Sequence, residues 1–459
     1  MRAIVLLTLL AFLAPARAAD YPAVPPSKDP ASLGLGVQRT MTLLATSTPE
    51  HRNKVRVLFY GQSITEQTWS KFVADDLRKR FPSADLEIEN RAIGGFASQL
   101  LIRPAEHDVY PFYPDLVIFH VYGSHTDYEQ IIKNIRSRTT AEVLMQRDHV
   151  TKWPAEKPDE KGDKGLWWDH MMNNVFLPKI AKTYGCGLAD VRSGWLAYLK
   201  ANNLEPKDLL KDGVHLNDHG NFVMAELVKQ NLVHRPELPA DAWKDLAKTV
   251  QVGTDVQWKD GRLTLDFEGN RVDLIAAADA LADAAPIQVV IDGKKPSEFD
   301  GCYRITRPQP GPWSPLALIR VDHDKPLVIE DWTMKITAVE KDAAGKDVWQ
   351  YTVRGSVTGD DGAGSSATLF TSPSGRVKIA PTGWYRAGAK LPVGYEIKWK
   401  VLPTHADTFA APKAADASHE RAVTIAQGLP NEKHTLTLTA AAGTTPGVKF
   451  IRIYRPPAK

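Results

Sequence analysis

A serine stands at the end of an apolar run near the start of the chain. Residues 55–60, VRVLFY, are rich in β-branched and aromatic side chains, which predicts a buried strand. The run ends at Gly61, and Gln62 and Ser63 follow. A hydroxyl just past the carboxyl end of a strand lies at the rim of a sheet, where open α/β sheets bind ligands. Ser63 is therefore either a nucleophile for acyl transfer or part of an ordinary turn.

A second candidate motif lies far along the chain, at residues 212–215, Asp-Gly-Val-His. An aspartate three residues before a histidine, in a loop that leads into a helix, can hold one nitrogen of the imidazole. The other nitrogen could then take the proton of Ser63, which is the chemistry of a Ser-His-Asp triad. The alternatives are a turn or capping role for Asp212 and a plain surface position for His215.

The segments between these motifs alternate between strand and helix patterns, which predicts a parallel, doubly wound α/β sheet. A charged loop is expected at about 148–166. Three of the strands end in glycine-containing turns, so their loops converge on one edge. The expected strands are 55–60, 85–90, 115–122, 141–146 and 186–191, and the expected helices are 67–80, about 97–107, 127–137, 169–184, 194–203 and 221–232.

The second half of the chain has a different pattern of polar and apolar residues. From about residue 236, segments such as RLTLDFEG, IQVVIDG and HTLTLTA alternate with a period of two and are separated by Gly, Pro, Asp and Asn turns. This pattern favours an antiparallel β-sandwich. Residues 274–285, LIAAADALADAA, are expected to form an inserted helix. We therefore predict an α/β domain over 19–235 and a β-sandwich domain over 236–459.

The N-terminus has the features of an export signal. One positive charge, an apolar run over 3–13 and the small-residue site Ala16-Arg17-Ala18 predict a signal peptide over 1–18. The apolar run is too short to span a bilayer, and no later segment approaches the roughly 20 apolar residues that a span needs. We expect a secreted or periplasmic protein without a membrane span.

Composition excludes some classes of partner. The 459 residues carry 57 basic and 54 acidic side chains, a net charge of +3, with no basic tract, which argues against nucleic acid as a partner. The two cysteines are far apart, and no Cys/His cluster has zinc-ligand spacing. We expect neither a metal nor an organic cofactor.

Other polar and aromatic residues allow two interpretations. Asp148 and His149 follow the fourth predicted strand and either line a substrate cleft or only shape a loop. Trp153, Trp167 and Trp168 lie in or beside the charged loop, where they either stack on sugar rings or pack the loop itself.

Taken together, the motifs resemble those of the SGNH (GDSL-type) hydrolases. The blocks are Gly61-Gln62-Ser63-Ile64, Asn90 with Gly94-Gly95, Pro114-Asp115 through Gly123, and Asp212 with His215, in this order over about residues 53–232. The resemblance implies a flavodoxin-like three-layer α/β/α fold. It also implies Ser63 as nucleophile, Asp212 and His215 as its partners, and the Ser63 and Gly95 amides as oxyanion donors.

The sequence departs from the family pattern in two blocks. Gln62 replaces the usual aspartate of Gly-Asp-Ser, at a position that is not catalytic. The family's Gly-x-Asn-Asp reads Gly123-Ser124-His125-Thr126, so His125 stands where the oxyanion-hole asparagine belongs. An imidazole N–H can donate to an oxyanion, which makes His125 the predicted third donor. Ser124, Asn90 or two backbone donors alone are the alternatives.

These observations predict an exported serine esterase that acts on O-acyl, chiefly O-acetyl, esters of a polysaccharide. Residues 423–439 and 447–455 resemble the terminal strands of β-sandwich modules that accompany secreted carbohydrate esterases, and the sandwich either binds glycan or only packs on the catalytic domain. The alternatives are a general short-chain esterase, a lipase or an acyltransferase, and an inert glycan-binding protein. The sequence supports the last only through its missing asparagine.

Overall fold

The computed structural model describes residues 21–155, 158–282, 285–309, 317–385, 390–413, 416, 418–441 and 447–458. The predicted signal peptide, 1–18, lies outside these residues. Within the part of the chain that is described, no helix is long and apolar enough to cross a membrane.

The first half of the chain is built on a five-stranded parallel sheet with the order β2-β1-β3-β4-β5. This is the flavodoxin-like order, and the predicted doubly wound α/β class is confirmed. The strands are β1 (Lys54–Gly61), β2 (Asp85–Asn90), β3 (Leu116–His120), β4 (Glu142–Gln146) and β5 (Gly187–Ala189).

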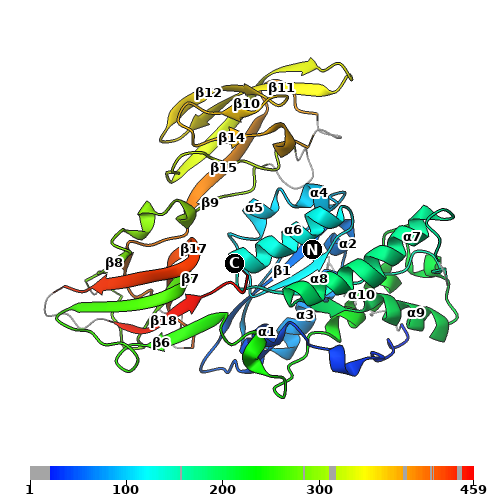
Figure 1. The fold of residues 1–459 in the computed structure, drawn as a ribbon, viewed down its shortest axis with the longest axis horizontal. Helices are drawn as coiled ribbons and strands as arrows, with labels where there is room; N and C mark the ends of the chain where they lie inside the picture. The colour runs from blue at the N-terminus through cyan, green and yellow to red at the C-terminus, as the bar shows by residue number, and fades with distance from the viewer. Residues whose placement is uncertain are drawn as a thin grey trace, which may run out of the picture.

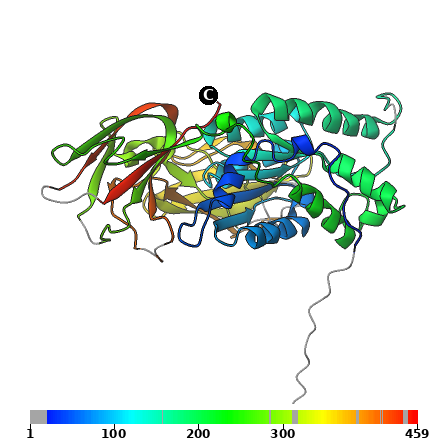
Figure 2. The ribbon, with the colours of Figure 1, turned by 90° about the horizontal axis from the view of Figure 1, so that it is seen from below.

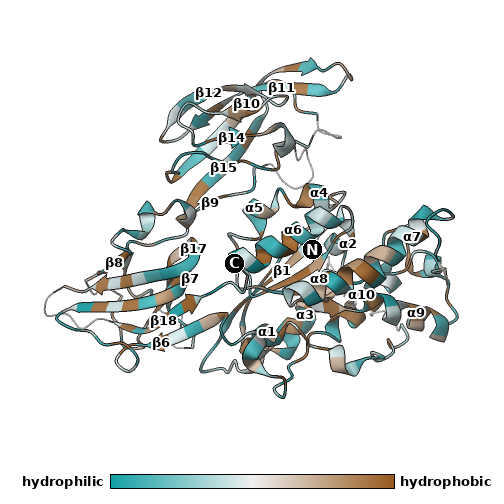
Figure 3. Cartoon of the chain, viewed as in Figure 1, coloured by the Kyte–Doolittle hydropathy of each residue, from teal (hydrophilic) through white to brown (hydrophobic). Residues whose placement is uncertain are grey.

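Helices cover both faces of this sheet, and strand residues alternate between two cores. Val55, Val57 and Phe59 of β1 pack against α1, α3, α9 and α10, whereas Leu58 and Tyr60 pack against α5, α6 and α8. In Figure 3 the helices carry both hydrophobic and hydrophilic residues, as helices between a core and solvent do. The helices are α1 (Gln38–Ala45), α2 (Ser63–Glu66), α3 (Trp69–Arg80), α4 (Ser98–Leu101), α5 (Ala105–Asp108), α6 (His125–Arg138), α7 (Lys164–His170), α8 (Leu177–Tyr184), α9 (Val191–Ala201) and α10 (Asp218–Lys229).

Two details of the α/β half differ from the prediction. Residues 97–107 form the two short helices α4 and α5 instead of one, and Pro104 stands at the N-cap of α5. Proline lacks the N–H that a continuous helix would need there. The expected loop over 148–166 ends early, since α7 begins at Lys164 and continues through a π-helical segment, Met171–Phe176, into α8.

The second half of the chain is antiparallel, as predicted, and its described residues form two large sheets with separate hydrophobic cores and one two-stranded hairpin. A six-stranded sheet has the order β16-β8-β17-β7-β18-β6 and contains β6 (Ala247–Gln251), β7 (Arg262–Ala276), β8 (Ile287–Ile291), β16 (Thr408–Phe409), β17 (Ala422–Thr439) and β18 (Val448–Tyr454). A five-stranded sheet contains β9 (Tyr303–Ile305), β10 (Glu330–Lys341), β11 (Asp347–Gly355), β12 (Gly359–Ser365) and β15 (Glu396–Pro403), with the hairpin β13 (Phe370–Thr371) and β14 (Lys378–Ile379) beside it.

The five-stranded sheet is inserted in the chain between β8 and β16 of the six-stranded sheet. Figure 1 shows the two sheets as separate bodies, with the five-stranded sheet beside α4 and α5. In Figures 1 and 2 the green and red strands of the six-stranded sheet lie at one end of the molecule, beside the blue and cyan parallel sheet.

The helix expected over 274–285 is not formed where the structure describes these residues. Leu274 and Ile275 belong to β7 and pair with β17 on one side and β18 on the other. Pairing on both edges overrides the helix propensity of the alanines. Residues 283–284 lie outside the described part of the chain.

Candidate active site

Ser63 lies where β1 turns into α2, at the carboxyl end of a central strand. This edge lies at the β1/β3 switch point of the strand order, where open α/β sheets bind ligands. The turn depends on Gly61, because a Cβ at this position would lie 2.1 Å from the His120 carbonyl oxygen and 2.4 Å from Thr65 Oγ1. The tight turn brings the Ser63 side chain out at the edge of the sheet.

The structure brings Ser63, His215 and Asp212 together across 152 residues of sequence. Ser63 Oγ lies 2.9 Å from His215 Nε2, and His215 Nδ1 lies 2.9 Å from Asp212 Oδ2. The histidine thus joins a hydroxyl to a carboxylate in the order that proton transfer from a serine requires. The side chains of His215 and Asp212 are 34% and 49% exposed, so the site is open to solvent.

Asp212 is held as a carboxylate by its own loop. Its Oδ1 accepts the backbone N–H groups of His215, at 2.7 Å, and Val214, at 2.8 Å. These hydrogen bonds, together with the His215 side chain, lower the pKa of Asp212 to about 2. Asp212 is therefore negatively charged wherever His215 can act as a base.

Side chains from elsewhere hold the backbone on both sides of His215. Gln67 follows α2 and makes two hydrogen bonds to Leu216, accepting its N–H at 3.0 Å and donating to its carbonyl at 2.8 Å. His149 Nε2 lies 3.0 Å from the Val214 carbonyl oxygen. Gln67 was not among the residues predicted from the sequence, where a glutamine four positions after Ser63 carries no recognisable signal.

Gly95 is an exposed residue of the largely buried loop after β2 and has a φ of +75°, a conformation that favours glycine. Its Cβ position is open space, so the backbone conformation and not crowding selects glycine here. Among the described residues, neither the Gly95 N–H nor the Ser63 N–H donates a hydrogen bond within the protein. Both amides are thus available to a ligand.

His125 begins α6, beside the carboxyl end of β3, and its ring stacks on Phe176 with centroids 4.1 Å apart. Its Nε2 is buried and has no hydrogen-bond partner among the described residues. Burial lowers the pKa of His125, which favours the neutral imidazole with its one N–H. The structure shows no contact between His125 and Ser63 or His215 within the described chain, so its role as a donor stays a prediction.

The side chain of Asn90, considered from sequence as an alternative oxyanion donor, is fully hydrogen-bonded within the protein. Its side-chain amide donates to the Thr65 carbonyl at 2.7 Å and to Ser70 Oγ at 3.0 Å, and its oxygen accepts the Ala92 N–H. Both amide hydrogens are used, so the suggestion that Asn90 contributes to an oxyanion hole is wrong. Asn90 instead holds the segment after Ser63 through its hydrogen bonds to Thr65 and Ser70.

Asp148, His149 and His120 form a buried cluster beneath the site. Asp148 Oδ1 lies 2.8 Å from His149 Nδ1 and 2.9 Å from His120 Nε2. Asp148 and His149 are 6% and 1% exposed, so they do not line an open cleft, which was one of the two interpretations from sequence. The three side chains carry metal-ligating atoms within 4.8 Å of one another, a grouping that spacing along the chain did not reveal.

Two of the three tryptophans near residue 160 have internal contacts. Trp168 lies beside the rings of Tyr122 and His125, and Trp153 Nε1 donates to Glu205 at 2.6 Å. Trp153 is 38% exposed. These contacts favour the packing interpretation for Trp168 and leave a face of Trp153 open to solvent.

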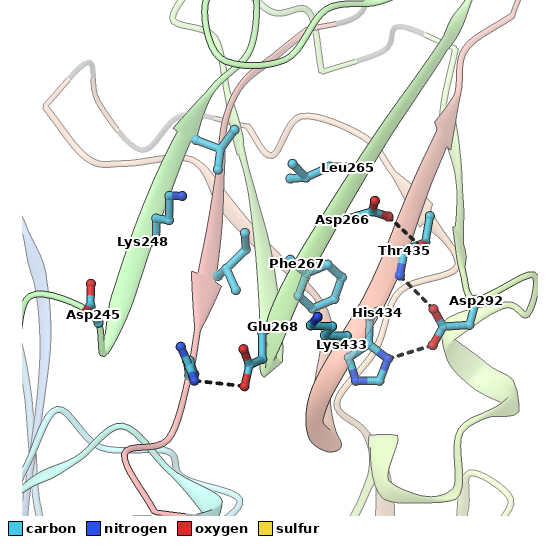
Figure 4. Close-up of a pocket in the computed structure, with 13 residues that line it drawn as sticks. Asp245, Lys248, Leu265, Asp266, Phe267, Glu268, Asp292, Lys433, His434 and Thr435 are labelled. Atoms are coloured by element: carbon cyan, nitrogen blue, oxygen red, sulfur yellow. Dashed lines mark hydrogen bonds and ion pairs between the residues drawn. The ribbon is translucent and has the colours of Figure 1, made fainter.

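A pocket of about 730 Å³ lies on the six-stranded sheet (Figure 4), and its lining includes none of Ser63, Asp212 and His215. Two pairs of side chains that line it contact one another. Asp292 contacts His434 and the Thr435 N–H, and Glu268 pairs with Arg455 at 2.9 Å. None of the described residues that line the pocket is a serine, and His434 is held between Asp292 and the Pro430 carbonyl, so this pocket does not repeat the arrangement at Ser63.

No family model and no curated protein matches the chain. The solved structures that it resembles include a two-domain esterase (CEX) active on acetylated mannans, with 15% identity, a TM-score of 0.36, and coverage of 94% of this chain and 99% of that chain. An acetyl xylan esterase, AlAXEase, has 25% identity and a TM-score of 0.32, and the match covers 38% of this chain and 98% of that chain.

A third structure with a similar chain is a putative GDSL-like lipase from Parabacteroides merdae ATCC 43184. It has 18% identity and a TM-score of 0.33, and the match covers 40% of this chain and 98% of that chain. These three proteins are described as esterases or as GDSL-like, the class that the sequence motifs resemble. The geometry around Ser63, and not these likenesses, supports the function proposed below.

Proposed function

We propose that this protein is a serine esterase of the SGNH type, in which Ser63 is the nucleophile, His215 the general base and Asp212 its partner. The observation that carries the proposal is the unbroken chain of hydrogen bonds from Asp212 through His215 to Ser63, with both distances at 2.9 Å. A serine that only formed a turn would not require a hydrogen bond to a histidine whose other nitrogen is bound by a carboxylate.

The reaction follows from this geometry as two acyl transfers. Ser63 Oγ attacks the ester carbonyl while its proton moves to His215 Nε2, and the Asp212 carboxylate stabilises the imidazolium. The tetrahedral oxyanion accepts hydrogen bonds from the Ser63 and Gly95 amides, with His125 as the proposed third donor. His215 then protonates the departing alcohol, and water, deprotonated by His215, releases the acid from the acyl-enzyme.

The proposed substrate is an O-acetyl ester on a polysaccharide or oligosaccharide. Three features support it: the leader sequence over 1–18, the β-rich half over 236–459, and the exposure of His215 and Asp212 to solvent. We propose that the leader directs export to the periplasm or the medium, and that the chain divides into a catalytic domain over 19–235 and an accessory region over 236–459. No metal or organic cofactor enters the proposed reaction.

The experiment that tests this proposal is acetate release from a panel of acetylated plant polysaccharides by wild type and by Ser63→Ala. Release by the wild type that is lost in the variant is the expected result and ranks the substrates. No release from any polymer, with short p-nitrophenyl esters also left intact, would overturn the proposal in favour of a binding protein on a hydrolase fold.

A further inference from the structure

We propose that His149 is a positioning residue for the reaction of Ser63: its imidazole holds the Val214 carbonyl and thereby keeps His215 in line with the serine. This inference rests on the proposed function, because it concerns the same site. It assigns a role to a buried histidine that does not touch the substrate.

The loop that carries the catalytic pair needs external support. Residues 211–215 lie outside any helix or strand, and 211–214 are exposed. Within the loop, Asp212 binds the N–H groups of Val214 and His215, and the Lys211 N–H donates to the His215 carbonyl. These contacts shape the loop but do not fix it to the sheet that carries Ser63. Leu216 is buried in the core, and the side chains of Gln67 at Leu216 and of His149 at Val214 attach the loop on either side of His215.

Both nitrogens of His149 face acceptors. Nδ1 lies 2.8 Å from Asp148 Oδ1, and Nε2 lies 3.0 Å from the Val214 carbonyl oxygen. Two acceptors are satisfied together only by an imidazolium, which donates from both nitrogens. Burial opposes this charge, but the Asp148 carboxylate and the hydrogen bonds to Asp148 and Val214 raise the pKa of His149 above its usual value.

His149 is in turn anchored to the rigid part of the fold. Asp148 follows β4, and its backbone N–H donates to Asn173 Oδ1 at 2.6 Å. His120, the last residue of β3, lies 2.9 Å from the same carboxylate oxygen that His149 contacts. The ring of Trp195 packs beside the His149 ring, with centroids 5.4 Å apart. His149 therefore connects the carboxyl ends of two central strands to the loop of His215.

Metal binding by His120, Asp148 and His149 is the competing interpretation. Two ligands on a tetrahedral zinc ion lie about 3.4 Å apart, since each is about 2.1 Å from the ion. The observed separations of 2.8 and 2.9 Å from Asp148 Oδ1 are those of N–H···O hydrogen bonds. The distances favour a hydrogen-bonded anchor over a metal centre.

Two matched variants separate the contacts of His149. In His149→Gln the amide nitrogen occupies the place of Nε2 and can still donate to the Val214 carbonyl. In His149→Asn the amide nitrogen occupies the place of Nδ1, so the contact with Asp148 is kept and the contact with Val214 is lost. Both variants remove the ring beside Trp195, so a general packing effect would be similar in the two.

The measurement is the second-order rate of labelling of Ser63 by a fluorophosphonate, together with kcat and KM for p-nitrophenyl acetate. His149→Asn is expected to lower the labelling rate and kcat about 100-fold, the cost of misplacing a catalytic group by about 1 Å, with KM little changed. His149→Gln is expected to react at close to the wild-type rate. Labelling of His149→Asn at the wild-type rate, or equal losses in both variants, would overturn the inference.

Three controls complete the experiment. Absence of labelling in the wild type would count against the proposed function itself, whereas a labelled wild type with unaffected variants would count only against the role of His149. If His149→Asn does not fold at 25 °C, His149→Phe serves instead, because it keeps a ring beside Trp195 but cannot donate a hydrogen bond to the Val214 carbonyl, and slower labelling is again expected. Loss of wild-type labelling after EDTA treatment, restored by zinc, would show a metal centre and overturn the inference.

Discussion

At the scale of single residues, the site is defined by which groups are charged before substrate arrives. Asp212 has a pKa of about 2 because two backbone N–H groups and His215 bind its oxygens. A group with a depressed pKa is ionised above that value and is neutralised only as the pH falls through it. Asp212 therefore contributes no titration between pH 4 and 9.

The ionised state of Asp212 gives the first prediction. Because Asp212 stays ionised, its own protonation adds no step to the pH dependence of kcat/KM between pH 4 and 9. Asp212→Asn keeps the shape of the side chain but removes the charge that stabilises the imidazolium, and is expected to lower kcat roughly 10³- to 10⁴-fold. A pH–rate profile checks both points. An Asp212→Asn variant of wild-type activity would contradict this account.

His125 gives a second prediction at the same scale. If its N–H binds the oxyanion, His125→Phe, which keeps the stacking on Phe176, and His125→Ala, which loses it, both lower kcat about 100-fold. Steady-state kinetics with p-nitrophenyl acetate provide the measurement. A Phe variant of wild-type activity would show that the two backbone amides suffice and that the ring is structural.

At the scale of elements, the site depends on how α2 is joined to the loop before α10. Gln67, the residue after α2, makes two hydrogen bonds to Leu216, so Ser63 and His215, the proposed nucleophile and base, are held in one frame. Gln67→Met has nearly the same length and makes neither bond. We expect kcat to fall about 10-fold and the free energy of unfolding to fall by about 1–3 kcal/mol, because two backbone groups lose their partner.

The Gln67 prediction is checked by kinetics and urea unfolding of the same preparations. Gln130→Met is a suitable control, because Gln130 bonds only to Asn134 on the exposed face of α6. A Gln67→Met enzyme with unchanged kcat would show that the loop is positioned without Gln67.

Elements with strong local patterns were the predictable part of this fold. β1, β3 and β4 are apolar runs, and Ser63 stands at the end of β1, a boundary that single-sequence patterns mark well. Asp212 and His215 lie in the loop before α10 and were predicted from their spacing. Asp148 and His149 were noticed, but their burial and their contact with Val214 depend on the packing of β3, β4 and the His215 loop. Contacts between segments this far apart leave no local signal in one sequence.

At the scale of the whole molecule, the β-rich half is fastened to the α/β half beside the loop of Gly95. Arg307, just after β9, donates to Asp108 of α5 at 2.9 Å and to the Arg91 carbonyl at 3.1 Å. His107 of α5 donates to the Ile305 carbonyl and accepts the Val321 N–H, consistent with a neutral ring whose pKa is lowered to about 4 by burial. Sequence alone predicted the antiparallel strands, but not that the five-stranded sheet is inserted within the other.

Arg307→Met is predicted to lower the free energy of unfolding by about 3–5 kcal/mol, because it leaves the Asp108 carboxylate buried without its partner. Arg354→Met is the matched control, since Arg354 pairs with Asp360 where both side chains are exposed, and less than about 1 kcal/mol is expected. Urea unfolding of the three proteins gives the comparison. Equally small losses of unfolding free energy in the two variants would show that Arg307 does not stabilise the contact between the two halves.

The central claim is that Ser63 forms the covalent bond to the acyl group. The direct measurement is acid quenching of the enzyme during steady-state hydrolysis of p-nitrophenyl acetate, followed by mass spectrometry of the peptide that contains Ser63. The account predicts an acetyl group on Ser63 in the wild type and none in Ser63→Ala, whose hydrolysis rate falls roughly 10⁴-fold or more. Hydrolysis by Ser63→Ala at the wild-type rate would contradict it.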